Sequence, residues 1–200
     1  MPATVKNYTS VDVPQGPADV WFDVALPGAA STVTLHTDGS PESVANPSAI
    51  HLGKLKDGVK CTYKPKLTPF VSDESGTPYR IALESDSISL SGTWLQLQNT
   101  ALLLRMMPSA TRTTGSGFER LTVGGMTAAL PYYVVMLVWP QPEAATAKFV
   151  SLIIYKAINM DGLAWGVSKK APSESTFTLE GLNVDSRAVN DQLFQINKQV

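Results

Sequence analysis

The sequence predicts an all-β, β-dominated fold: a β-sandwich or barrel of about eight to ten strands with one flanking α-helix. Extended runs rich in β-branched and aromatic residues recur along the chain, turn dipeptides separate them, and one segment carries a helical pattern. The clearest block lies at 148–184. There an apolar run (149–158) meets Asp161-Gly162, a second extended run (163–167) follows, and a third (176–180) ends at Gly181.

The N-terminal region is punctuated by proline. Residues 1–19 are predicted to form an extended arm, because their apolar side chains are isolated and Pro14 and Pro17 cannot donate ladder hydrogen bonds. Two short extended runs, 20–26 and 32–36, follow it. We expect 1–200 to be a single domain that carries this arm and several long loops.

The middle of the chain holds the longest alternating pattern. Residues 59–63 and 67–71 are predicted as strands, with Lys64-Pro65-Lys66 interrupting them. Residues 79–91 then alternate as one long strand, in which Asp86 marks a bulge or an exposed edge.

One segment, 93–107, is predicted to be the α-helix. It has a broad apolar face, Ser91 or Thr93 could cap it, and Pro108 prevents its continuation.

The rest of the chain is predicted to be loop and strand. The polar stretch 109–117 reads as an exposed loop, 118–123 and 128–139 as strands, and 185–200 as a tail.

Composition limits the function classes. The net charge is −1 with a pI near 6.1, so the chain lacks the basic excess of a tight nucleic-acid binder. The N-terminus lacks a secretion signal, and the most apolar run, 132–139, is far shorter than the roughly 20 residues that span a bilayer. We therefore expect no membrane contact, and synthesis in a cytoplasm.

No catalytic, metal or cofactor site is predicted. His36 and His51 stand in unrelated contexts, Cys61 is the single cysteine, and Gly115-Ser116-Gly117 lacks the strand and helix of a nucleophile elbow. Asp73-Glu74 lacks the spacing of a calcium loop. The protein is therefore predicted not to be an enzyme.

The order of the elements between residues 50 and 184 resembles the major tail, or tail tube, proteins of long-tailed bacteriophages. The matching pieces are an early strand at 58–63, an acidic loop SDESGTP at 72–78, the alternating strand 79–91 running into a helix at 94–107, and the closing block KFVSLIIYKAINMDGLAWGVSKKAPSESTFTLEGL at 148–182.

This resemblance implies a virion structural protein without a cofactor. Its subunits would form stacked hexameric rings whose sheets join into a barrel around a lumen. The genome would pass through that lumen without specific binding during ejection, and the tube would contact tape measure, terminator and baseplate proteins. Residues 50–69 or 109–117 are candidates for contacts between rings.

A lumen that lets DNA slide should be lined by acidic or neutral polar side chains. The candidates are Glu84, Asp86 and Glu180, with the hydroxyl residues Ser87, Ser175, Thr176 and Thr178 at alternate strand positions. The alternative is that these residues simply face solvent.

Two other functions stay open. A tail terminator or baseplate ring protein of similar fold would form single rings rather than tubes. A carbohydrate-binding or adhesin sandwich would place Trp21, Trp94, Trp139 or Trp165 on an exposed sugar platform.

Overall fold

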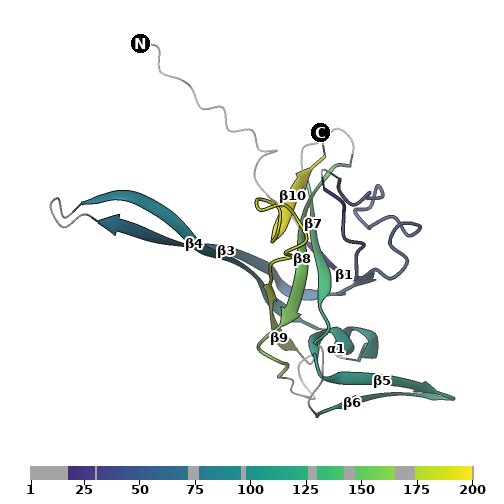
Figure 1. Cartoon of the computed structure of the whole chain (residues 1–200). Helices are drawn as coiled ribbons and strands as arrows, with labels where there is room; N and C mark the ends of the chain where they lie inside the picture. The colour runs from purple at the N-terminus through teal and green to yellow at the C-terminus, as the bar shows by residue number, and fades with distance from the viewer. Residues whose placement is uncertain are drawn as a thin grey trace.

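The computed structural model describes residues 18–29, 31–71, 77–95, 98–125, 130–141, 147–164 and 174–199. Within these ranges the chain forms ten strands and one helix, so the predicted β-dominated fold with a single helix is confirmed (Figure 1). In chain order the elements are β1 (Asp19–Phe22), β2 (Ile50–His51), β3 (Leu55–Val71), β4 (Pro78–Trp94), α1 (Thr100–Met106), β5 (Ala110–Gly115), β6 (Phe118–Val123), β7 (Tyr133–Pro140), β8 (Phe149–Asn159), β9 (Ser175–Gly181) and β10 (Phe194–Lys198).

One antiparallel sheet of eight strands organises the molecule. Its strands follow the order β2-β1-β7-β8-β9-β4-β3, β10 pairs with β8 off this path, and β5 and β6 form a separate hairpin. The path ends at β2 and β3, so the sheet does not close into a barrel. On one side, β8 pairs first with β10 and then, for its last three residues, with β9. The sheet therefore divides at β8, and its two branches, β10 and β9-β4-β3, separate from there.

The main core lies on one face of the central strands. Alternate residues of β1, β7, β8, β4 and β9 meet there, and Leu102 and Met106 of α1 close the end. Trp94, Phe22 and Phe177 are the largest aromatic side chains fully buried in it. Burying alternate positions of strands from both branches gives the packing of a β-sandwich.

The opposite face of β7 and β8 is also covered. Met136, Val138, Ile153 and Tyr155 form a second cluster there with residues that precede β2. Asn46 fixes this covering segment, because its amide accepts from the Ala25 N–H at 2.9 Å and donates to the Glu42 carbonyl at 3.0 Å. Residues of both parities in β7 and β8 are therefore buried, which explains their continuous apolar runs.

The helix is shorter than predicted, because β4 continues to Trp94 and occupies the start of the expected 93–107 segment. The N-cap is Asn99, not Ser91 or Thr93; its side-chain oxygen accepts from the N–H groups of Ala101 and Leu102 at 3.1 and 3.3 Å. At the other end, Asn159 donates to the carbonyl of Met106 at 2.8 Å and ties α1 to β8.

Two strand predictions were wrong in the first half of the chain. β1 ends at Phe22 because Asp23 takes a positive φ of 56°, so the run 20–26 is not one strand. Leu35, in the predicted run 32–36, forms only an isolated bridge with Pro41.

The segments 59–63 and 67–71 belong to one strand, β3, rather than two. Its prolines are tolerated because no described strand pairs with its outer edge.

The predicted loop at 109–117 is instead β5 and the turn of a hairpin with β6. Thr111, Thr113 and Thr114 favour the extended backbone, and Gly117, the second central residue of the turn, takes a positive φ of 79° that glycine adopts without strain.

In the second half of the chain, β7 begins at Tyr133 rather than at residue 128. Leu163 and Ala164, the start of the predicted run 163–167, lie outside any strand, and the rest of that run lies outside the described residues. The segment 185–200 contains β10, which extends the sheet beside β8. Of the predicted arm, 1–17 lie outside the described residues, and Asp19 begins β1.

Candidate assembly surface

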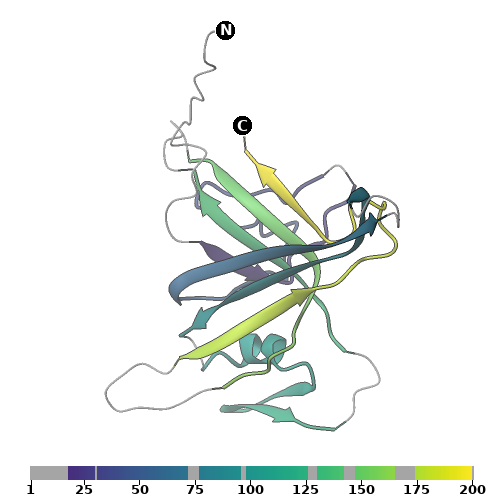
Figure 2. The same ribbon diagram turned by 90° about the vertical axis from the view of Figure 1, so that its left-hand side faces the viewer.

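The dominant surface feature is the β3–β4 hairpin. The two strands pair antiparallel from Leu55 opposite Trp94 to Val71 opposite Pro78, and the outer half of the hairpin projects from the body (Figure 1). In Figure 2 this projection points toward the viewer. β9 pairs with β4 only over residues 88–94. No described strand flanks the outer half, residues 78–87 of β4.

The inner half of the hairpin is part of the core. Ile88, Leu90 and Trp94 are at most 1% exposed, and Val59 and Cys61 of β3 pack against them. Burial raises the pKa of the Cys61 thiol, as expected for a small apolar packing residue. Here one face of the hairpin is covered by β8, β9 and α1 residues of the same cluster.

The outer half continues the same apolar face without a cover. Leu67 lies opposite Leu83 and Pro69 opposite Ile81, and the three aliphatic side chains are 55, 56 and 62% exposed, respectively. We call Tyr63, Leu67, Pro69, Ile81 and Leu83 the apolar stripe. Cross-strand pairs of this kind stabilise a sheet more when water is excluded from them, and here more than half of each aliphatic side chain remains in water. The stripe is therefore an exposed hydrophobic patch of the kind that marks an interaction site.

A β-bulge keeps the stripe on one face. Ser85 pairs with Lys66 and Leu83 with Leu67, so Glu84 is an extra residue on β4. Because of the insertion, the apolar side chains stand at even positions in the buried inner half (Ile88, Leu90) and at odd positions in the exposed outer half (Leu83, Ile81). The sequence pattern predicted a bulge or an exposed edge at Asp86; the change of apolar parity along 81–90 is the signal that locates the bulge at Glu84.

The opposite face of β3, β4 and β9 is polar between Lys60 and Thr68, and Phe70 is exposed on it nearer the tip. Hydroxyl side chains occupy the alternate positions of β4 and β9, and lysines those of β3, so that Lys60, Ser91 and Thr178 lie side by side across three strands. We call this the hydroxyl face; it comprises Lys60, Thr62, Lys64, Lys66, Ser87, Ser89, Ser91, Thr93, Thr176, Thr178 and Glu180.

The three acidic lumen candidates do not share one surface. Glu180 lies on the hydroxyl face, in register with Ser89. Glu84 extends that face and accepts from Lys66 Nζ at 2.7 Å and Thr68 Oγ1 at 2.8 Å, contacts that hold the pKa of its carboxyl below the usual value. Asp86 lies on the other face, in phase with Ile88. Among the hydroxyl candidates, Ser87, Thr176 and Thr178 lie on the hydroxyl face, whereas Ser175 is buried.

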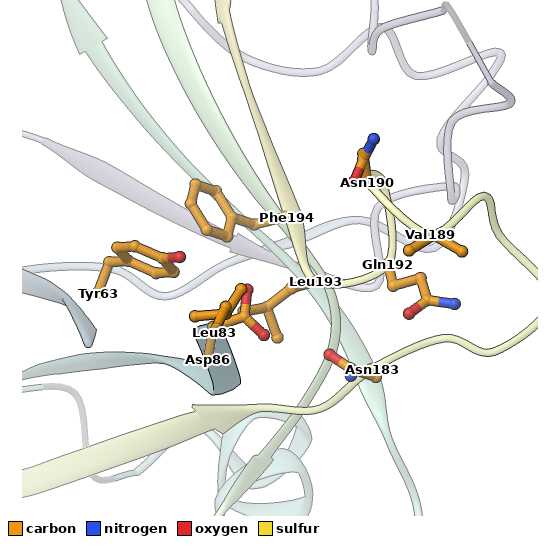
Figure 3. A pocket seen from close by; sticks show the side chains of 9 residues that line it. All are labelled: Tyr63, Leu83, Asp86, Asn183, Val189, Asn190, Gln192, Leu193 and Phe194. Carbon is orange, nitrogen blue, oxygen red and sulfur yellow. The ribbon is translucent and has the colours of Figure 1, made fainter. Parts of the chain in front are cut away.

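Asp86 lines a pocket at the base of the apolar stripe (Figure 3). The pocket has a volume of about 430 Å³ and lies between the hairpin and the segment that precedes β10. The rings of Tyr63 and Phe194 form one side, with centroids 5.6 Å apart. The amide side chains of Asn183, Asn190 and Gln192 complete its polar lining.

The segment 185–193 is held in place by a cluster on β8. The Arg187 guanidinium lies 4.0 Å from the Tyr155 ring centroid, bonds Asp191 and donates to the Pro27 carbonyl at 2.6 Å. The Tyr155 hydroxyl donates to the Asp191 carboxylate. That hydrogen bond, with the Arg187 guanidinium, lowers the pKa of Asp191, and burial together with the same hydrogen bond raises the pKa of Tyr155 to about 12.

The free edge of β3 carries features that discourage strand pairing. Pro65 and Pro69 offer no N–H donor, and Lys56, Lys60 and Lys64 add charge along it. Within Ile81–Ser87 of β4, by contrast, neither proline nor lysine occurs. The protection is therefore confined to one edge of the hairpin.

The β5–β6 hairpin is a second projection, and it is mainly polar. Arg112 bonds Glu119 at 2.6 Å, Thr100 of α1 also donates to Glu119, and Arg120 lies over the Phe118 ring. The hydrogen bond from Thr100, and to a lesser extent that from Arg112, lowers the pKa of Glu119. Its apolar exposure is limited to the single residues Phe118 and Val123.

The described tryptophans do not form a sugar platform. Trp94 is fully buried, Trp139 is half-buried against the main core, and Trp21 is half-buried and packs on His51 at 4.8 Å between ring centroids. Trp165 lies outside the described residues. No described tryptophan therefore supports the carbohydrate-binding alternative.

The residues considered for catalysis are separated in the structure. His51 Nε2 lies 3.0 Å from Asp19 Oδ1 at the surface, and His36 belongs to the turn before Pro41. In the described part of the chain, no three His, Cys, Asp or Glu side chains gather as a metal site, and no helix is long and apolar enough to cross a membrane. Asp73 and Glu74 lie outside it.

Comparison with known proteins gives a limited result. No protein-family model matches the sequence, and no curated protein is significantly similar to it. Among solved structures, the crystal structure of Hcp protein is similar over 92% of this chain and 100% of that chain, with a TM-score of 0.31 and 12% identity. A likeness this weak does not assign a function, so the proposals below rest on the surfaces of this chain.

Proposed function

We propose that this chain is a non-enzymatic structural subunit that assembles with copies of itself through the β3–β4 hairpin. The observation that carries the proposal is the apolar stripe, which continues the core face of the hairpin beyond the edge of the body. An isolated two-stranded hairpin is marginally stable in water, and one that exposes aligned Leu and Ile side chains is an aggregation hazard. A neighbouring subunit would cover the stripe and remove that hazard.

We propose a head-to-tail contact rather than a reciprocal two-fold one. The hairpin projects on one side, whereas the pocket beside Asp86 lies at its base on the body. When one surface of a subunit binds a different surface of the next, the contact closes into a ring or continues as a filament. The finer proposal is the tail tube of a long-tailed bacteriophage: stacked rings, hexameric by resemblance, within a virion.

In the tube, the hydroxyl face is proposed to line the lumen. Glu84 is already paired with Lys66, so the charges without an ion pair on this side of the hairpin, within the described residues, are Lys60, Lys64 and Arg80 against Glu180. The hydroxyl side chains outnumber the charges of this face, so we expect it to offer DNA few phosphate contacts and to let it slide. Asp86, on the opposite face, is no longer proposed as a lumen residue.

Electron microscopy of the purified full chain tests the proposal. Negative-stain images across a concentration series should show tubes. Single rings at every concentration would favour the terminator or baseplate alternative, and a monomer at high concentration would contradict self-assembly.

A set of variants locates the contact. Replacing Leu67, Ile81 and Leu83 together by Thr keeps β-propensity but removes the apolar stripe, and should abolish assembly while leaving the fold intact. Val44→Thr is the matched control, because Val44 is 88% exposed and lies away from the hairpin. Assembly that survives the triple substitution would exclude the stripe as the interface.

The lumen assignment has its own test. Replacing Glu84 and Glu180 by Lys should add salt-dependent DNA retention to assembled tubes. Tubes that pass DNA equally well at every salt concentration would contradict it.

A further inference from the structure

We propose that the pocket beside Asp86 is a guanidinium-binding site, and that its occupant is Arg80 from the hairpin of a second copy of this chain. The inference rests on the proposed self-assembly and names the side-chain contact that would align one copy with the next. The chemistry of the pocket, the state of Arg80 and the distance between the two residues each contribute to it.

The pocket has the chemistry of an arginine site. Asp86 supplies the carboxylate that a guanidinium binds through two hydrogen bonds. The Tyr63 and Phe194 rings, tilted by 59° to each other, supply faces on which a planar cation stacks (Figure 3). The amide oxygens of Asn183, Asn190 and Gln192 can accept the remaining N–H groups. Among the described residues, the Asp86 carboxylate has no ion pair or hydrogen bond.

Arg80 is the arginine that lacks such a partner within the described ranges. Arg105, Arg112 and Arg187 each bond a carboxylate, and Arg120 lies over Phe118. Arg80 is exposed near the outer end of β4, opposite Phe70. It thus stands on the part of the molecule that reaches farthest from the body (Figure 1).

The two residues cannot meet within one molecule. They are six positions apart on β4, about 20 Å at the rise of an extended strand, and the bulge at Glu84 places them on opposite faces. A contact between them must therefore join two copies. Each copy carries one Arg80 and one pocket, so the proposed head-to-tail contact can repeat from subunit to subunit, whereas a reciprocal exchange would close two copies into a dimer.

The critical concentration for assembly, measured by ultracentrifugal pelleting, tests the contact. Asp86→Asn and Arg80→Gln should each raise it by at least about 30-fold, the effect expected when one partner of a desolvated ion pair is removed. Glu84→Gln, on the same strand but already paired on the other face, is the matched control for Asp86 and should leave it unchanged. Arg120→Gln serves the same purpose for Arg80.

Two further experiments distinguish the loss of this contact from general unfolding of the variants. The exchanged pair Asp86→Arg with Arg80→Asp should restore assembly that each single reversal abolishes. A mixture of Asp86→Asn and Arg80→Gln chains should form pairs that do not extend, because the one intact contact joins Arg80 of the first chain to the pocket of the second, and both outer ends of the pair carry a substitution. Sedimentation velocity distinguishes such pairs from monomers and tubes.

The outcomes also separate the two proposals. A wild-type chain that stays monomeric at all concentrations contradicts self-assembly itself. A wild type that assembles while Asp86→Asn or Arg80→Gln assembles equally well contradicts the Asp86–Arg80 contact and leaves self-assembly standing.

Discussion

The inner and outer halves of the β3–β4 hairpin carry the same alternation of apolar and polar side chains in different surroundings. Leu90, in the inner half, is fully buried, whereas Leu83, seven residues earlier on the same face, is 56% exposed. The inner half is flanked by β9 and covered by the core; the outer half has neither among the described elements. An amphipathic pattern therefore predicts that one face of a hairpin must be covered. It does not predict whether the same chain or another copy covers it.

The largest effect on monomer stability should come from truncating a leucine in the inner half, and the same truncation in the outer half should have little effect. Leu90→Ala should destabilise the monomer by about 2–5 kcal/mol, because it leaves a cavity in the core. Leu83→Ala should change monomer stability by less than about 0.5 kcal/mol, since its side chain is largely in water already. Urea denaturation below the assembly concentration measures both. Equal losses would mean that the outer half is also covered within one molecule.

A smaller loss of monomer stability should follow from removing the buried hydrogen bonds that hold α1 against β8. Asn159 donates to the Met106 carbonyl at 2.8 Å and to the Gly162 carbonyl at 2.9 Å, and so joins α1 to β8. Asn159→Ala should cost about 1–3 kcal/mol, because the buried Met106 carbonyl loses its partner. The reduction should appear in the denaturation midpoint, with no change in assembly once the protein is folded. A stability equal to that of the wild type would mean that this bond is not needed to hold α1.

The stability contributed by the segment 185–193, which lines the pocket at the base of the hairpin, should depend on pH. The pKa of Tyr155 is raised from near 10 to about 12, first by burial and then by its hydrogen bond to Asp191. The folded state keeps this proton where the unfolded chain has lost it, so the contribution is complete below pH 10 and is lost as the pH rises to about 12. Tyr155→Phe should flatten the decline of stability over that range. An unchanged profile would contradict the role of Tyr155 in holding the segment 185–193.

The smallest effect should come from the ion pair on the outer half. Glu84→Gln removes an exposed carboxylate whose pKa is lowered by hydrogen bonds from Lys66 and Thr68. We expect no measurable change in the thermal midpoint, because exposed pairs of this kind contribute little. A clear destabilisation would show that the outer half depends on the polar contacts of its own hydroxyl face.

The sequence predicted the parts of this structure that depend on local pattern. Among the described residues, the strand at 149–158 follows from its β-branched run, and the single helix from the apolar face that ends before Pro108. The sequence did not predict the start of the helix, because Trp94 suits a helix and a strand equally. Its burial in the core favours the strand. The strand at 110–115 was missed since the turn residues Ser116-Gly117 were taken as part of a loop rather than of a hairpin.

The candidate site was predictable only in part. Glu84, Asp86 and Glu180 were selected together by charge and alternation, yet the bulge at Glu84 puts Asp86 on the other face. The pocket beside Asp86 joins β3 and β4 to a segment about a hundred residues later, and no local pattern indicates that contact. The parity change between Ile81-Leu83 and Ile88-Leu90 was visible in the sequence and locates the bulge.

The central claim, that the outer half of the hairpin is covered by another copy, can be measured by site-specific photo-cross-linking. A photoreactive side chain at position 67 or 83, in a mixture of full-length copies of two tagged sizes, should yield covalent adducts between the two sizes. The same group at position 44 should yield none. Adducts absent from 67 and 83 at concentrations where the protein assembles would contradict the account.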